Sequence, residues 1–275
     1  VEGAYSEAAM KEFFGSDTDS FHVETWRDAM EAIKNGEADY AVLPIENSSA
    51  GSVRENYDLL VEYDHCIVGE QIIKIEHVLL GLPEAELSDI DQVYSHPQAL
   101  MQCSKILEEH RDWEKISLKN TAVSAKKVKE DGKKNQAAIA SKLTAELYGL
   151  KILKENLSNN ADNYTRFIIV TGKHVFEKDA KKVSICFEIP HQSGSLYQMI
   201  SHFIFNGINM TKIESRPIQG KNWEYRFFID IEGNLNDGAV QNALNGLSEE
   251  TSKLKILGNY CLLYTSPSPR DRQKS

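Results

Sequence analysis

The chain has 275 residues, of which 41% are hydrophobic and 26% charged, a composition typical of a soluble globular protein of about two domains. Lys and Arg number 31 against 41 Asp and Glu, and the net charge of -10 argues against a broad nucleic-acid-binding surface. No apolar run approaches the ~18 residues of a membrane span. The four scattered cysteines show neither zinc nor disulfide spacing, which favours a reducing, cytoplasmic location.

The two ends of the sequence differ from its body. Val1 and Gly3 lead into a helix with no strand before it, so we expect the natural start to lie upstream. Residues 261–275 contain two prolines and no apolar periodicity, and we expect them to be a non-native or disordered tail.

Helical and strand-like patterns alternate between residues 4 and 170. The expected helices are 6–14, 26–34, 52–63, 97–110, 121–130 and 142–148, and the expected strands are 38–43, 66–82, 91–95, 116–118, 137–140 and 165–170. This alternation predicts an α/β region, 1–172, with two lobes and a central cleft, like that of periplasmic binding proteins. Lobe one would comprise about 1–77 plus 157–172, and lobe two about 78–156.

The pattern changes after a Lys- and Asp-rich linker, residues 173–180. Residues 181–260 alternate in the order βαββαβ, which is the ferredoxin-like arrangement. The sequence therefore predicts a second, smaller domain behind the α/β region.

The segment from Pro44 to Val53 lies between an expected buried strand and an expected helix. Small hydroxyl residues there would leave backbone N–H groups exposed at the helix N-terminus, which favours anions. Ordinary N-capping by Ser48, Ser49 or Ser52 explains the same residues equally well. Glu46 indicates a role beyond N-capping for this segment, because a carboxylate beside an anion site is unfavourable unless it has its own partner.

Two other segments carry polar groups suited to chemistry. In Asn163-Tyr164-Thr165-Arg166-Phe167, the arginine could bind a carboxylate through two hydrogen bonds, and the threonine hydroxyl is an uncharged hydrogen-bond donor. A polar start to a strand, with the arginine on the surface, would account for the same residues. His96 and Gln98 lie at a strand-to-helix turn, where a lone histidine is more often a structural cap than a catalyst. No Ser/His/Asp order, H-E-x-x-H or nucleotide-binding glycine pattern is present, so we expect no metal and no cofactor.

Taken together, these segments resemble the prephenate dehydratase family. The matching segments are Gly3-Ala4-Tyr5-Ser6-Glu7-Ala8-Ala9, Pro44-Ile45-Glu46-Asn47-Ser48 with Gly51-Ser52-Val53, Ser95-His96-Pro97-Gln98-Ala99-Leu100, and Asn163 to Phe167. Residues 181–260 resemble the ACT regulatory domain: Gly194-Ser195-Leu196 stands where the family has Gly-Ala-Leu, and Glu214-Ser215-Arg216-Pro217 matches its phenylalanine-responsive segment. The opening also resembles fused enzymes that carry chorismate mutase upstream.

The resemblance implies a carbon–oxygen lyase that converts prephenate to phenylpyruvate with loss of carbon dioxide and water. We expect Thr165 to donate a proton or hydrogen bond to the leaving hydroxyl, since positioned proton transfer contributes ~10²–10⁴-fold. We expect Arg166 and the N–H groups from Ser48 to Ser52 to hold the pyruvyl carboxylate, with Tyr5 and Phe167 lining the cleft. The full set of expected substrate-binding residues is Ser6, Glu46, Asn47, Ser48, Gly51, Ser52, Asn163, Arg166 and Phe167.

The resemblance also implies feedback by L-phenylalanine. The expected effector site lies between ACT domains of two subunits, in a homodimer or homotetramer, and comprises Gly194, Ser195, Leu196, Asn209 and Met210, supported by Glu214, Ser215, Arg216 and Pro217. Two alternatives remain: the same chemistry on arogenate, and a non-catalytic protein that binds a small anion.

Overall fold

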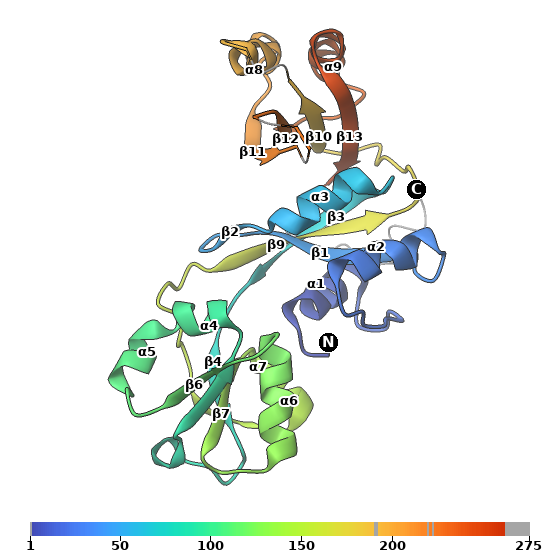
Figure 1. Cartoon of the computed structure of the whole chain (residues 1–275). Helices are drawn as coiled ribbons and strands as arrows, with labels where there is room; N and C mark the ends of the chain where they lie inside the picture. Colours follow the sequence, from blue (N-terminus) through green and yellow to red (C-terminus); the bar gives the residue numbers. More distant parts are fainter. Residues whose placement is uncertain (1, 190–191, 219, 222, 262–275) are drawn as a thin grey trace.

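The computed structural model describes residues 2–189, 192–218, 220–221 and 223–261 (Figure 1). Its helices are α1 (Tyr5–Phe14), α2 (Trp26–Lys34), α3 (Arg54–Glu62), η1 (Leu87–Asp89), α4 (Pro97–Gln102), α5 (Ser104–Glu109), α6 (Thr121–Asp131), α7 (Lys142–Tyr148), α8 (Ser195–Phe205) and α9 (Gly238–Glu250). Its strands are β1 (Tyr40–Asn47), β2 (Gly51–Ser52), β3 (Cys66–Lys74), β4 (Val78–Gly81), β5 (Gln92–Ser95), β6 (Glu114–Ser117), β7 (Gln136–Ala140), β8 (Lys151–Lys154), β9 (Tyr164–Thr171), β10 (Lys182–Glu188), β11 (Met210–Pro217), β12 (Tyr225–Glu232) and β13 (Ser252–Tyr260). Within these described ranges, no helix is both long and apolar enough to cross a bilayer.

Strands β1, β2, β3 and β9 form the sheet of lobe one, in which β9 is antiparallel to both β1 and β3. Helix α1 packs on one face of this sheet, where Phe167 is buried. Helices α2 and α3 cover the opposite face, where Ile168 is buried. Because side chains alternate along a strand, Thr165 points to the α1 face and Arg166 to the α3 face.

Strands β4 to β8 form the sheet of lobe two, in the order β6-β5-β7-β4-β8. Strand β5 is parallel to β6 and β7, and β4 is antiparallel to β7 and β8. The chain passes between the lobes at residues 75–77 and again at 155–163. The backbone N–H of Ile75 donates to the carbonyl of Asn163 at 2.8 Å, so the two crossings lie side by side.

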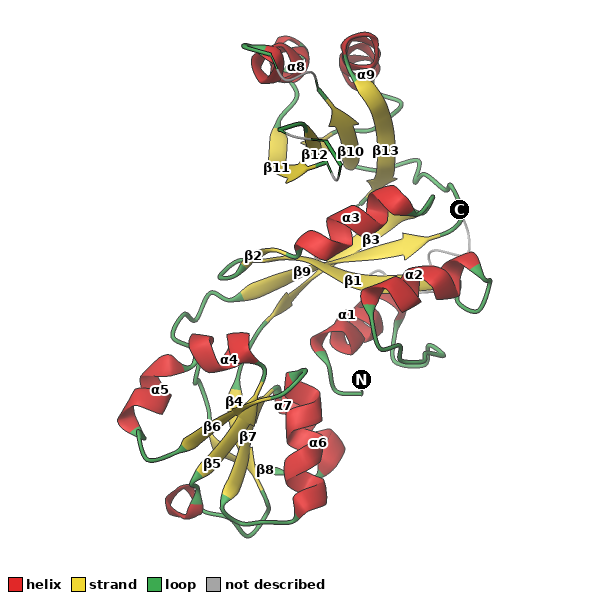
Figure 2. Cartoon of the chain, viewed as in Figure 1, coloured by secondary structure: helices red, strands yellow, loops and turns green. Residues whose placement is uncertain are grey.

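The C-terminal module has the predicted βαββαβ order, from β10 to β13, with the antiparallel order β11-β12-β10-β13. Helices α8 and α9 cover one face of its sheet (Figure 2). The other face packs on α3 of lobe one, where the rings of Tyr57 and Phe228 lie 4.9 Å apart between centroids. Strand β13 also pairs in parallel with β3 at Gly258 and Ile67, so the module and lobe one share one eight-stranded sheet.

The α/β class is confirmed, but several boundaries differ from those predicted. The helix expected over 97–110 is interrupted at Cys103, whose backbone (φ -111°, ψ 23°) is not helical. Residues 66–82 form two strands because the chain leaves lobe one between them. Strand β8, only four residues long, was missed. Of the expected tail, residues 262–275 lie outside the described residues.

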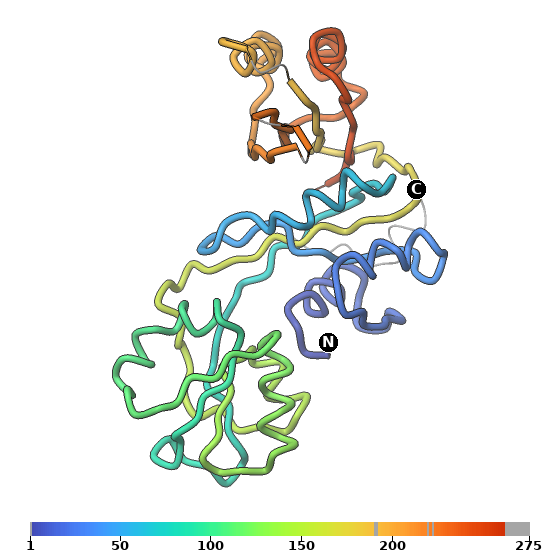
Figure 3. Tube along the Cα trace, viewed as in Figure 1, coloured from blue at the N-terminus to red at the C-terminus, as the bar shows by residue number. Residues whose placement is uncertain are grey.

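Figure 3 traces the path of the chain and shows how this topology places distant segments together. The chain leaves lobe one after β3, builds all of lobe two, and returns as β9 between β1 and β3. The segments that begin and end lobe two therefore meet near the start of β9. That is where the predicted catalytic Thr165 lies.

Candidate active site

Thr165 on β9 pairs in register with Asn47 on β1. The Asn47 side-chain oxygen accepts from the backbone N–H groups of Ser49 (3.0 Å) and Ala50 (2.9 Å), so the Nδ2 end of this amide is the donor. Nδ2 lies 2.9 Å from Thr165 Oγ1 and 2.8 Å from Asn163 Oδ1. Thr165 is only 9% exposed, and since its oxygen accepts from Asn47, its hydroxyl proton is available for another group.

A chain of side-chain hydrogen bonds continues from Asn163 across both crossings. Asn163 Nδ2 donates to Gln102 Oε1 of lobe two (3.1 Å), and the same oxygen lies 3.1 Å from His77 Nε2. His77 Nδ1 lies 3.3 Å from the Tyr5 hydroxyl, whose single proton is donated to the carbonyl of Glu76 at 2.8 Å. We call this the amide chain; in order, its members are Thr165, Asn47, Asn163, Gln102, His77 and Tyr5.

Burial determines the protonation of the two ionisable members of the amide chain. It lowers the pKa of His77 from its ordinary value, so the imidazole is neutral at pH 7. It raises the pKa of Tyr5, with smaller contributions from Cys103 and Glu76, so the phenol stays protonated. The amide chain therefore consists of neutral groups, which donate and accept hydrogen bonds without carrying a formal charge.

Arg166 does not lie beside Thr165. Its Nη1 is 2.7 Å from Asp230 Oδ2 and 3.2 Å from Glu70 Oε2, and Lys182 Nζ is 2.9 Å from that same Glu70 oxygen. Burial alone would raise the pKa of Asp230, but Arg166 and Lys182 outweigh it and hold the pKa below its ordinary value. In this structure the guanidinium expected to hold a substrate carboxylate is bound by protein carboxylates, because strand alternation turns it to the face of the sheet opposite Thr165.

At the expected backbone anion site from Ser48 to Ser52, three of the five N–H groups already have acceptors within the protein. The N–H of Ser48 donates to the carbonyl of Tyr164 (2.8 Å), those of Ser49 and Ala50 donate to Asn47, and that of Val53 donates to Ile45 (2.9 Å). Helix α3 starts only at Arg54 and has no side-chain cap, so no serine caps it. The segment forms a β1–β2 hairpin instead: the N–H groups of Ser49 and Ala50 are bonded within it, and that of Ser48 is bonded to β9.

Glu46 and Ser52, both expected to bind substrate, instead contact the C-terminal module. Lys212 Nζ of β11 lies 2.8 Å from Glu46 Oε1 and 3.3 Å from Ser52 Oγ. Ser52 Oγ donates to Glu214 Oε2 at 2.7 Å. The other Glu46 oxygen is 3.6 Å from Arg166. The partner that Glu46 requires is thus a lysine of the module.

The expected effector residues lie on both faces of the module's sheet. Gly194 precedes α8 with φ 86°, Ser195 is buried and Leu196 is exposed, all on the helical face. Glu214 and Arg216 lie on the opposite face, where the Arg216 guanidinium donates two hydrogen bonds, in bidentate fashion, to the Asp58 carboxylate of α3. Of the remaining four, Asn209 directly precedes β11 and is exposed, and on β11 itself Met210 is half-buried while Ser215 and Pro217 are exposed.

The other expected residues have mainly structural surroundings. Ser6 lies in the first turn of α1, and Gly51, with φ 82°, begins β2 directly after the turn that follows β1. Phe167 is 3% exposed and belongs to the core under α1, not to an open cleft wall. His96 caps α4 by accepting from the N–H of Gln98 at 3.2 Å, which confirms the structural interpretation of that histidine.

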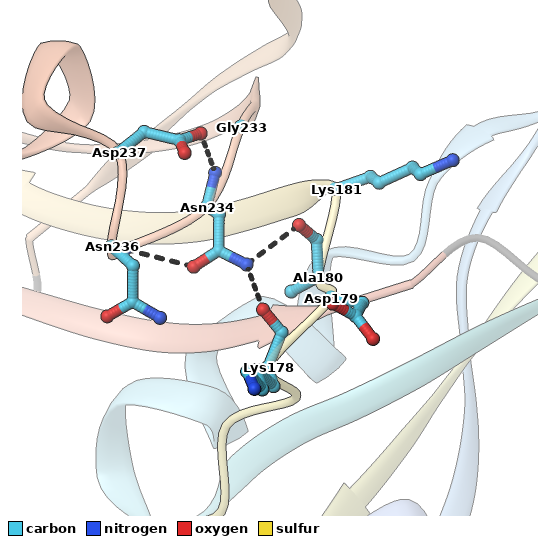
Figure 4. A pocket seen from close by; sticks show the side chains of 8 residues that line it. All are labelled: Lys178, Asp179, Ala180, Lys181, Gly233, Asn234, Asn236 and Asp237. Carbon is cyan, nitrogen blue, oxygen red and sulfur yellow. Dashed lines mark hydrogen bonds between the residues drawn. The ribbon is translucent and has the colours of Figure 1, made fainter.

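Two hollows in the described part of the chain lie away from the amide chain. One, of about 470 Å³, lies between the linker and the module and is lined by Lys178, Asp179, Ala180, Lys181, Gly233, Asn234, Asn236 and Asp237 (Figure 4). Asn234 Nδ2 there donates to the carbonyls of Lys178 and Ala180, which fastens the linker to the module. The other, of about 430 Å³, lies beside Tyr63 and His65 of lobe one. In the described part of the chain, no three His, Cys, Asp or Glu side chains gather as metal ligands would.

The family model described as prephenate dehydratase matches residues 1–175. The bifunctional chorismate mutase/prephenate dehydratase of Enterobacter agglomerans is 37% identical over 265 residues, covering 94% of this chain and 68% of the relative. The Arabidopsis thaliana arogenate dehydratase/prephenate dehydratase 1 is 39% identical, covering 94% and 70%.

Two solved structures superpose over almost the whole chain. The prephenate dehydratase of Arthrobacter aurescens in complex with L-Phe has a TM-score of 0.89 at 32% identity, covering 98% of this chain and 90% of that one. A structure titled as GqqA, a novel type of quorum-quenching acylase, has a TM-score of 0.87 at 32% identity, covering 97% and 96%. From the family model and these relatives, the chain belongs to the prephenate dehydratase family.

Proposed function

We propose that this chain catalyses the decarboxylating dehydration of prephenate to phenylpyruvate in L-phenylalanine biosynthesis. The observation that carries the proposal is the Thr165 hydroxyl, whose oxygen accepts from Asn47 and whose proton is left to donate. As the ring carboxylate leaves as carbon dioxide, its bonding electrons complete the aromatic ring and the ring hydroxyl departs. A proton donated to that hydroxyl releases it as water. Positioned proton donation of this kind is worth roughly 10²–10⁴-fold.

The neutral character of the amide chain suits this reaction. A fixed cation at the ring carboxylate would stabilise the ground state against loss of carbon dioxide, whereas uncharged donors orient the substrate without that penalty. Arg166 and Lys182 are both engaged by buried carboxylates on the other face of the sheet. We therefore assign proton donation to Thr165 and orientation to the amides of Asn47, Asn163 and Gln102.

We further propose that the C-terminal module is an ACT domain through which L-phenylalanine regulates the enzyme. Its βαββαβ order supports this, as does the similarity to a structure solved with L-Phe. Large apolar side chains are exposed on α8 and on the edge strand β11, including Tyr197 (69%), Phe205 (81%) and Ile213 (46%). Such a surface is typical of a partner contact, and we assign it to a second copy of the module in a cytoplasmic homodimer or homotetramer.

The contacts between the module and lobe one offer a physical route for this regulation. Asn47 on β1 and Thr165 on β9 both belong to the amide chain. The residue directly before Asn47, Glu46, and the residue directly after Thr165, Arg166, point to the opposite face of the sheet, toward the module. A shift of β11 or β12 that moves Lys212 or Asp230 would therefore displace the backbone that holds the catalytic hydroxyl. Interfaces of this kind have discrete packing arrangements, which is what a two-state response requires.

The direct test is turnover of prephenate, followed by the ultraviolet absorbance of phenylpyruvate in alkali. Thr165→Ser keeps the hydroxyl and is expected to retain most of the activity, whereas Thr165→Val keeps the shape and is expected to lose about 10²-fold or more in kcat. Wild-type turnover by the Thr165→Val protein would eliminate the central assignment.

Parallel assays separate the rival functions. Arogenate offered in competition identifies an arogenate dehydratase, and release of a free acid from an N-acyl substrate identifies an acylase. Binding of prephenate without any product would indicate the non-catalytic anion-binding protein.

A further inference from the structure

His77 lies in the first crossing between the lobes, directly before β4, and is 3% exposed. Its ring touches lobe one through Tyr5 of α1 and lobe two through Gln102 of α4. Asn163 of the second crossing contacts the same Gln102 oxygen. One imidazole thus lies where both crossings and both lobes meet.

The donor and acceptor roles along the amide chain follow from its fixed end. Two backbone N–H groups orient the Asn47 amide, so Asn47 donates to Asn163 Oδ1. The other end of the Asn163 amide is then the donor to Gln102 Oε1. Because that oxygen is an acceptor, the His77 nitrogen 3.1 Å away must carry a proton.

A neutral imidazole carries one N–H, so His77 is the Nε2–H tautomer and its Nδ1 is unprotonated. The Tyr5 hydroxyl lies 3.3 Å from Nδ1 but donates its single proton to the Glu76 carbonyl. The Gln102 oxygen is then held by two donors, one from each crossing. Its NH₂ group makes no hydrogen bond to any residue that the structure describes. Both donors of Gln102 consequently remain available to a bound ligand.

We propose that His77 is a positioning residue of the dehydratase reaction, acting through the Nε2–H that it donates to Gln102. Without this donor the Gln102 amide can rotate by 180° and present an NH₂ group to the Asn163 NH₂ group, a contact between two donors. The donor and acceptor roles of the hydrogen bonds from Asn163 through Asn47 to Thr165 would then no longer be fixed from the His77 end of the amide chain. This inference rests on the proposed function, and it assigns His77 no contact with the substrate.

The kinetic test compares two substitutions at His77 with one at a matched control. His77→Gln keeps an N–H at about the reach of Nε2, and His77→Leu removes it. His65 is the control: it is equally buried (6%), its Nε2 lies 3.0 Å from the carbonyl of Met30, and it is outside the amide chain. Thermal melts of all variants establish that they are folded.

The expected result is a loss of about 10–100-fold in kcat for His77→Leu with KM changed by less than about threefold, in line with the cost of misplaced catalytic groups. His77→Gln should restore kcat to within about threefold of wild type. His65→Leu should lower the melting temperature but not kcat. Wild-type kcat in His77→Leu, an equal loss in His65→Leu, or no recovery in a folded His77→Gln protein would each overturn the inference.

A second measurement does not depend on turnover. In ¹⁵N-histidine NMR at neutral pH, His77 should show a protonated Nε2 and an unprotonated Nδ1, and the opposite tautomer would contradict the proposal. If the wild-type protein does not convert prephenate, the proposed function fails, and the tautomer still decides whether His77 orders the amide chain.

Discussion

Replacing Asp230 by Asn should destabilise the contact between the C-terminal module and lobe one. The buried cluster holds two cations, Arg166 and Lys182, against two carboxylates, Glu70 and Asp230. Asn is nearly isosteric, so Asp230→Asn leaves one cation without a counter-charge. Breaking a buried pair on one side costs about 3–5 kcal/mol, which for a chain of this size lowers Tm by roughly 6–20 °C.

Two controls distinguish a buried-charge effect from ordinary loss of a surface pair. Asp39→Asn removes an exposed pair with Lys173 (74% and 71% exposed side chains) and should change stability by less than about 1 kcal/mol. Adding Lys182→Met to Asp230→Asn restores the charge balance and should recover part of the lost stability. An Asp230→Asn protein that melts within about 2 °C of wild type would refute this reasoning.

The same cluster predicts a pH dependence. The pKa of Asp230 is lower in the folded protein than the ordinary value of about 3.9. A lowered carboxyl pKa stabilises the fold fully above pH ~4, and that stabilisation is lost as the pH falls through the folded-state pKa. Urea midpoints measured from pH 6 to pH 2 should therefore fall more steeply for wild type than for Asp230→Asn; parallel profiles would contradict the assignment.

Three further outcomes are expected. Asn47→Leu should lower kcat by about 10²-fold, because Thr165 loses the donor that orients it; unchanged turnover in steady-state assays would contradict this. Lys212→Met should weaken the effect of L-phenylalanine on turnover by about tenfold in concentration, because it breaks the contact with Glu46; an identical inhibition curve would exclude this route. Gly258→Ala should cost about 1–3 kcal/mol in thermal melts, since its methyl group would lie 2.3 Å from the Ile67 carbonyl, whereas Gly238→Ala, with no atom within 4 Å, should cost little; equal effects would argue against a tight junction there.

The amino-acid sequence by itself determined the α/β class, the βαββαβ order of the C-terminal module and the segment that contains Thr165. These features are local: a period of 2 or 3.6 residues, a cap such as His96, and short contiguous motifs are all legible in the chain order. The interpretation of His96 as a cap was confirmed for the same reason, because its partner Gln98 is two residues away.

Only the tertiary structure decided which groups surround Thr165. The amide chain joins Tyr5, Asn47, His77, Gln102 and Asn163, which are up to 158 residues apart, and no local pattern connects them. The return of β9 between β1 and β3 brings these segments together at the two crossings.

The tertiary structure also decided the direction in which Arg166 and Glu46 point. Consecutive residues on a strand face opposite sides, so a motif that reads as one site along the sequence was divided between two faces of the sheet. Thr165 and Asn47 face the amide chain, while Arg166 and Glu46 face the charges of the module. The packing of the module on α3 then showed which face of the sheet each carboxylate and each cation occupies, and so which residues of the motif contact the module.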